Sequence, residues 1–215
     1  MTAQLPQQPE YPVQFSIDYP DRDLNRVTTA FRIFTIIPIA IVLGAVSGGS
    51  WQYSYPNGAR AVIVAAGGLL FVGPLLMILF RQKYPRWWFD FNLAFLRFDN
   101  RVMSYLLLLR DEFPSTDEDQ AVHLDVRYPD VHSELNRWLP LVKWFLAIPH
   151  YVALLVLDVA MVFGAIVAWI AILATGRYPR PLFDFTVGVM RWHNRVVSYA
   201  FAMATDEYPP FRLAA

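Results

Sequence analysis

Two short stretches of the chain alternate apolar and polar residues, a pattern typical of a half-buried strand. The first runs from Val13 to Ile17 and the second from Val122 to Val126, and Tyr-Pro-Asp follows each of them and ends the predicted strand. An isolated strand would leave its backbone groups unpaired. We therefore expect the two strands to pair with each other in a small cytoplasmic sheet that lies against a membrane.

Three longer blocks are apolar and almost free of charge. Val27 to Val46 holds only Arg32, Ala61 to Phe80 holds no charge, and Trp144 to Thr175 holds only Asp158. Blocks of this length can cross a bilayer, so the pattern predicts one transmembrane helical hairpin over about residues 27–81 and a second over about 138–175. Asp158 lies near the midpoint of the second. We favour an outer turn there; the alternative is a re-entrant hairpin in which Asp158 is a membrane-embedded acid.

Two further segments are amphipathic when their residues are placed at 100° intervals. Each carries one polar stripe, with apolar residues and nearby tryptophans around it. Such helices suit the plane of the membrane interface. The stripes consist of Asp90, Arg97, Asn100, Arg101 and Ser104 in the first segment and Asp184, Arg191, Asn194, Arg195 and Ser198 in the second.

The second half of the chain repeats motifs of the first half in the same order. Tyr-Pro-Asp, Leu-Asn-Arg, Tyr-Pro-Arg, Phe-Asp-Phe and a closing Asp-Glu-aromatic-Pro occur once in each half. They predict a flexible N-terminus at 1–10, a first repeat at 11–114, a linker at 115–120 and a second repeat at 121–213. The expected fold is mainly α-helical and integral to a membrane. It has two tandem pseudo-twofold repeats, each with a short cytoplasmic β-strand, a transmembrane helical hairpin and an amphipathic interfacial helix.

Composition and charge agree with a membrane location. Hydrophobic residues make up 56% of the 215 positions and the formal net charge is zero, which is too apolar for an ordinary soluble domain. Of the 18 Lys and Arg residues only Arg60 lies between the first two apolar blocks, so a multi-pass protein with cytoplasmic N- and C-termini is expected. The absence of cysteine excludes disulfides and thiolate nucleophiles. No nucleic-acid partner is expected.

The arginine pairs are the most prominent candidate site. Arg97 with Arg101, and Arg191 with Arg195, could clamp an anionic lipid headgroup, because guanidinium groups bind phosphate bidentately. The structural alternative, which we favour, is an ion pair with a nearby carboxylate such as Asp90, the counterpart of Asp184 in the second half.

Two ionisable residues in the apolar block from Trp144 to Thr175 are weaker candidates. His150 and Asp158 are singled out only because an ionisable group inside a membrane is often functional. The sequence contains no metal-binding histidine pattern, hydrolase elbow or phosphate-binding glycine loop. We therefore predict no catalytic residue, no cofactor and no metal site.

Several motifs of the second half carry a resemblance to a known family. These are Ala147-Ile-Pro-His150, the segment from Gly176 to Phe185 and the segment from Asp206 to Phe211. With Tyr-Pro-Asp and Leu-Asn-Arg they resemble a family of bacterial integral membrane proteins of unknown function, some of which carry tandem copies of the domain. The first half departs from the pattern, for example with Ile39 in place of His150. The resemblance implies a bacterial cytoplasmic membrane and transfers no functional residue.

Together these features predict a non-catalytic membrane protein that acts as an accessory or scaffold subunit. Its expected partners are the lipid bilayer, other protein subunits or further copies of the chain, and an anionic lipid. The competing prediction is a protein that binds or transports a lipid or an apolar small molecule, with the arginine pairs at the level of the headgroups.

Overall fold

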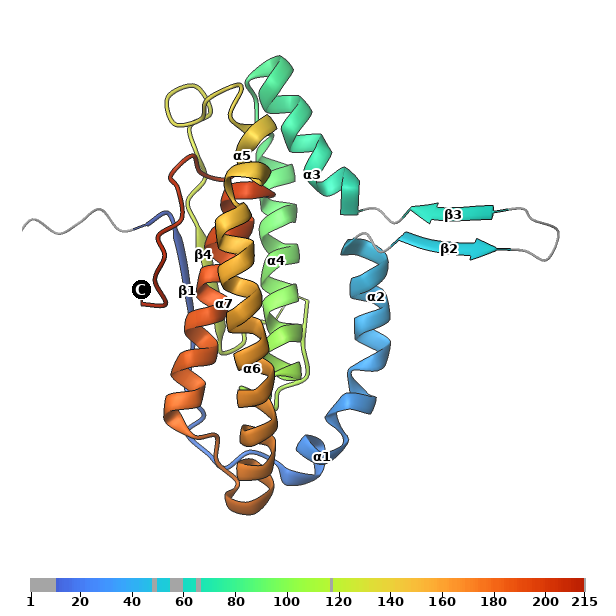
Figure 1. Ribbon diagram of the computed structural model, residues 1–215, viewed down its shortest axis with the longest axis vertical. Helices are drawn as coiled ribbons and strands as arrows, with labels where there is room; N and C mark the ends of the chain where they lie inside the picture. The colour runs from blue at the N-terminus through green and yellow to red at the C-terminus, as the bar shows by residue number, and fades with distance from the viewer. Residues whose placement is uncertain (1–10, 48–49, 55–59, 65–66, 117, 215) are drawn as a thin grey trace, which may run out of the picture.

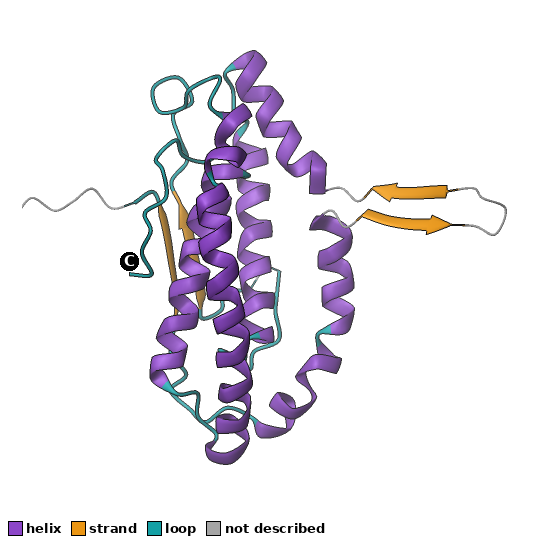
Figure 2. Ribbon diagram, viewed as in Figure 1, coloured by secondary structure: helices purple, strands orange, loops and turns teal. Residues whose placement is uncertain are grey.

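The computed structural model describes residues 11–47, 50–54, 60–64, 67–116 and 118–214. These residues form seven α-helices, one π-helical turn and four strands (Figures 1 and 2). The segment 1–10, predicted to be flexible, lies outside the described residues.

The two predicted strands form and pair with each other. β1 (Val13–Ile17) and β4 (Val122–Val126) are antiparallel, and Phe15 lies opposite Leu124 at the centre of the sheet. The backbone N–H of Asp18 donates to the carbonyl of Ala121, so hydrogen-bonded pairs alternate along the ladder from this point. It follows that the carbonyls of Phe15 and Leu124 point away from the partner strand. They need hydrogen-bond donors from outside the strand pair.

A layer of two long helices covers the apolar face of the sheet. α7 (Arg180–Ala200) packs on β1, and α4 (Arg86–Leu106) packs on β4, so each strand lies on the helix from the other half of the chain. The two helices run antiparallel, because Tyr84, just before α4, donates its hydroxyl proton to the carbonyl of Ala202, just after α7. The largest apolar core lies here, between the sheet and the helices.

The remaining helices lie outside this layer. α6 (Ile148–Thr175) contacts α7, α2 (Ile37–Ser47) contacts α4, and the short helix α5 (Pro140–Leu146) precedes α6. In Figure 1 α6 runs along the length of the molecule beside α7. α1 (Arg26–Thr35) begins at Asn25, whose side chain accepts hydrogen bonds from the backbone N–H groups of Val27 and Thr28.

The first predicted hairpin, over 27–81, is wrong. The region is divided among α1, α2, a β-hairpin and α3 (Gly67–Leu76), which ends in the π-helical turn η1 (Met77–Arg81). The β-hairpin pairs β2 (Ser50–Ser54) with β3 (Arg60–Val64), and no α-helix in the described part of 27–81 exceeds 11 residues. Short apolar runs rich in β-branched residues, such as Arg60 to Val64, have the same apolar pattern in a strand and in a buried helix.

The second predicted hairpin, over 138–175, is also wrong. α6 is one continuous helix of 28 residues, and Asp158 lies within it and not at a turn. The turn was inferred from chain length alone, whereas no proline and only one glycine, Gly164, interrupt the sequence from His150 to Thr175. α6 is the one helix within the described residues that is long and apolar enough to cross a membrane. The expected two-hairpin membrane fold is thus overturned.

The amphipathic segments form the helices α4 and α7, but only Asp90 and Asp184, near the start of each polar stripe, lie on an exposed surface, and the later part of each stripe is buried. Asn100, Arg101 and Ser104 are buried on α4, and Asn194, Arg195 and Ser198 are buried on α7. The sequence gives the period of the stripe but not its direction. Arg97 and Arg191 reach carbonyls of the sheet, whereas the buried groups bond the other long helix or the segments that follow their own helices.

Candidate functional site: arginines, asparagines and buried cations

Arg97 and Arg191 bind the carbonyls that point outward from the middle of each strand. Arg97 donates from Nε to the carbonyl of Leu124 at 2.8 Å, and Arg191 donates from Nε to the carbonyl of Phe15 at 3.0 Å. Arg97 also pairs with Asp125, 2.9 Å away, while Arg191 donates to the carbonyl of Leu213. Both guanidinium groups therefore satisfy backbone acceptors that the two-stranded sheet leaves open.

Arg101 and Arg195 hold the segments that follow their own helices. Arg101 donates to the carbonyl of Ser115 at 2.8 Å. Arg195, which is 1% exposed, donates to the carbonyls of Arg212 at 3.1 Å and Ala214 at 2.8 Å. Burial lowers the pKa of the Arg195 guanidinium, and the positive charges of Arg212 and Arg191 act in the same direction.

The carboxylates expected beside these arginines have other partners. Asp90 pairs with Arg86 and Asp184 pairs with Arg180, in each case at 3.1 Å and four residues apart on an exposed helix surface. The guanidinium groups of Arg86 and Arg180 also lie over tyrosine rings, 4.7 Å and 4.6 Å from the ring centres of Tyr128 and Tyr19.

Asn100 and Asn194 join the two long helices through a reciprocal amide pair. Each Nδ2 donates to the Oδ1 of the other residue at 2.7 Å. Each Nδ2 also donates to the carbonyl four residues earlier in its own helix, and both side chains are buried. Buried amides need their partners, so this pair fixes the position of α4 along α7.

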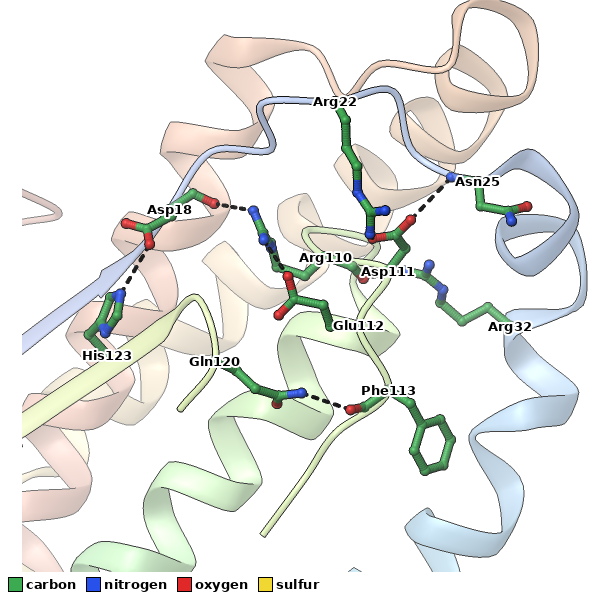
Figure 3. A network of polar contacts seen from close by, with 10 residues as sticks. All are labelled: Asp18, Arg22, Asn25, Arg32, Arg110, Asp111, Glu112, Phe113, Gln120 and His123. Carbon is green, nitrogen blue, oxygen red and sulfur yellow. Dashed lines mark hydrogen bonds and ion pairs between the residues drawn. The ribbon is translucent and has the colours of Figure 1, made fainter. Parts of the chain in front are cut away.

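Two buried cations, which the sequence analysis did not select, occupy matching positions in the two halves. Arg32 is 1% exposed and donates to the carbonyls of Tyr105 at 2.9 Å and Arg110 at 2.7 Å, with its guanidinium 4.3 Å from the centre of the Tyr105 ring. Figure 3 shows Arg32 beside Asp111, which accepts a hydrogen bond from the backbone N–H of Asn25. Burial lowers the pKa of Arg32, and Tyr105 and Asp111 counteract this.

Lys143 repeats this arrangement in the second half. Its Nζ is fully buried, donates to the carbonyl of Thr205 at 2.7 Å and lies 2.7 Å from a carboxylate oxygen of Asp206 and 5.1 Å from the centre of the Tyr199 ring. Burial lowers the pKa of Lys143, and Asp206 counteracts this. A sequence signal was present: Arg32 and Lys143 are isolated cations that follow Leu-Asn-Arg at the same spacing in apolar surroundings.

His150 lies in an aromatic enclosure near the start of α6. Trp192 donates from Nε1 to Nδ1 of His150 at 3.0 Å, and the imidazole stacks on Phe211 with 4.0 Å between ring centres. The imidazole is 0% exposed, and its Nε2 atom contacts no hydrogen-bond partner among the described residues.

Asp158 lies at the contact between α6 and α7, and 36% of its side chain is exposed. Its carboxylate lies 3.4 Å from His193 on α7, and Asp99 on α4 interacts electrostatically with the same histidine. Burial raises the pKa of Asp99, and His193 partly opposes that shift. Within the described residues, no group of three or more His, Asp or Glu side chains could hold a metal ion.

Fold and contacts define a helical protein with a small polar-faced sheet on one side and an exposed apolar helix on the other. Residues 138–212 match a family model described as Domain of unknown function (DUF4389), so such a domain is found in the second half of the chain. Comparisons with curated proteins and with solved structures found no match.

Proposed function

We propose that the protein is a membrane-bound accessory or scaffold subunit without catalytic activity. The observation that carries this proposal is the outer face of α6. Only 22% of the most apolar 18-residue window of this helix is buried. The large apolar side chains on its outer face are more than one-third exposed, and exposed apolar surface on this scale marks a lipid or protein contact. The exposed apolar residues on this face of α6 are Val152, Leu155, Val156, Val159, Val162, Phe163, Ile166, Val167, Trp169 and Ile170.

The use of the interior polar groups supports a non-catalytic role. Arg101, Arg191 and Arg195 donate to backbone carbonyls, and Lys143 is held by Thr205 and Asp206. Arg191 and Lys143 join segments that are distant in the sequence, and Arg101 and Arg195 hold the segments that follow their own helices. The buried polar network therefore supports a rigid framework for binding a partner.

Location and repeat structure belong to the same proposal. The resemblance to bacterial membrane proteins and the distribution of Lys and Arg support the cytoplasmic membrane of a bacterium, with both termini in the cytoplasm. Three pairs of residues make equivalent contacts in the two halves, and this supports a duplicated chain. The pairs are Arg97 and Arg191, Asn100 and Asn194, and Arg32 and Lys143.

The first experiment is membrane fractionation followed by native mass spectrometry of the full chain, purified from its native membrane in mild detergent. We expect the chain to stay with the membrane through a carbonate wash and to carry another protein in fixed stoichiometry. Phe163→Glu on the outer face of α6 should weaken retention, while Asp184→Glu on an exposed surface is the matched control. A chain that is soluble or purifies without any partner would contradict the proposal.

A pocket favours a second candidate function, the binding of an apolar small molecule. Its volume is about 230 Å³, and it lies between α3, α4 and α7. Leu70, Phe71, Asn92, Phe95, Leu96, Val197, Phe201 and Ala202 line it. Retention of a lipid by the purified chain, and its loss on Val197→Trp, would favour this candidate over the subunit.

A further inference from the structure

The sheet presents a charged outer face opposite the apolar helix. Residues alternate along β1 and β4, so Phe15 and Leu124 are buried while Asp18, His123 and Asp125 point outward. The Asp125 side chain is 80% exposed and that of Asp18 is 66% exposed. This face therefore requires water or a polar partner.

α6 and the sheet lie on opposite faces of α7. Arg191 reaches β1 through the carbonyl of Phe15, whereas His193 reaches α6 through Asp158. Two residues along an α-helix are separated by about 200° around its axis, so these side chains leave α7 in opposite directions. The order through the molecule is thus the charged face of the sheet, α7 and the exposed apolar face of α6.

The same two contacts place the sheet beside the middle of α6. Arg191 and His193 differ by about 3 Å along the axis of α7. Phe15, the centre of β1, is therefore level with Asp158, which lies near the middle of α6. A strand of five residues is about 17 Å long. If α6 stood upright in a bilayer, the whole charged face of the sheet would lie within the hydrocarbon, where exposed charges are strongly disfavoured.

We infer that α6 lies in the plane of the membrane, with its outer face among the acyl chains of one leaflet and the sheet facing water. This inference rests on the proposed membrane binding and adds an orientation to it. Both ends of the molecule carry exposed cations suited to lipid headgroups. Arg26 and Arg177, which pairs with Asp23 at 2.9 Å, lie at the end where α6 finishes, and Arg81 and Lys83 lie near the segment that precedes α5.

Single-cysteine labelling tests the orientation, because the natural chain contains no cysteine. Asp21→Cys marks the end of the molecule near Arg177, Ser133→Cys marks the opposite end, and Asp125→Cys marks the sheet. Phe163→Cys marks the outer face of α6. Each full-length variant is reconstituted in sealed vesicles of a phosphatidylethanolamine and phosphatidylglycerol mixture and treated with a membrane-impermeant maleimide, applied from outside or enclosed within the lumen.

The expected result is labelling of Asp21→Cys, Ser133→Cys and Asp125→Cys from the same side, and no labelling of Phe163→Cys until detergent is added. Labelling of the two ends from opposite sides, with Asp125→Cys protected, would overturn the in-plane orientation while leaving membrane binding intact. Recovery of the chain outside the vesicles, with Phe163→Cys labelled, would instead remove the membrane binding on which both proposals depend. Far-UV circular dichroism establishes that each variant is folded.

Discussion

Lys143 offers the sharpest test of what holds the outer helices to the core. It is fully buried on α5, and its ammonium group binds the carbonyl of Thr205 and lies 2.7 Å from Asp206. Lys143→Met keeps the length and apolar stem of the side chain but removes the charge. The carboxylate of Asp206 and the carbonyl of Thr205 then lose their cation.

The expected loss of stability follows from the burial of this pair. Removing one partner of a buried ion pair typically costs about 3–5 kcal/mol, because the remaining charge is left uncompensated. The Asp206 side chain retains 18% exposure and accepts the backbone N–H of Asn136, so water and this bond offset part of the loss. We therefore expect a value of about 3 kcal/mol for Lys143→Met.

Unfolding in detergent micelles, followed by the fluorescence of the seven tryptophans, measures this value. The double variant Lys143→Met/Asp206→Asn should recover part of the loss, since the unpaired charge is gone. Arg180→Ala is the control, because the exposed pair with Asp184 should contribute at most about 1 kcal/mol. Equal losses for Lys143→Met and Arg180→Ala would refute the reasoning.

The pH dependence gives a second readout for the same residue. Burial lowers the pKa of Lys143 in the folded chain below its unfolded value of about 10.4. Between these two pKa values the unfolded chain binds more protons, so stability should rise as the pH increases through that window. The rise should be missing in Lys143→Met. An unchanged slope in the variant would show that Lys143 is not the group responsible.

Three further variants test other parts of the fold. Asn194→Ala should lower the free energy of unfolding by about 1–3 kcal/mol, because the buried amide of Asn100 loses both reciprocal bonds; a loss no larger than that of an exposed substitution would contradict this. Gly176→Ala should cost about 1–2 kcal/mol by thermal unfolding, since Gly176 ends α6 at a φ of 80°. Burial raises the pKa of Asp99 above about 3.9, so stability should fall as pH rises from 3.9 to the raised value, and Asp99→Asn should abolish that fall in a pH series of unfolding curves.

The parts of the fold that the sequence predicts are those with a distinctive period. Strict alternation identified both strands, Val13–Ile17 and Val122–Val126, and the need to satisfy their backbone groups predicted their pairing. The polar stripes likewise identified α4 and α7. In each case the pattern repeats often enough to distinguish a strand from a helix.

Continuously apolar segments gave no such guidance. β3 and α6 contain little polar contrast, so neither has a period that the sequence could reveal. β2 alternates polar and aromatic residues from Ser50 to Ser54, a strand signal that the hairpin interpretation missed. Breaking residues were the better guide: residues 39–81 contain Pro56 and Pro74, whereas no proline follows Pro149 in α6. Length alone placed a turn at Asp158, and length cannot distinguish two short arms from one long helix.

The candidate site shows the same division between residue type and direction. The sequence selected Arg97 and Arg191 but not their acceptors, because the carbonyls of Phe15 and Leu124 become available only once the strands pair. The acceptors of Arg101 and Arg195 lie in loop segments whose path the sequence does not predict. A two-stranded sheet has two open edges, and each must be covered or satisfied. Arg97 and Arg191 supply donors midway along these edges, while the Asn100–Asn194 pair and the segments bound by Arg101 and Arg195 account for the buried part of the stripe. α6, by contrast, has an apolar face that the rest of the described chain does not cover, and this face requires an apolar environment outside the chain.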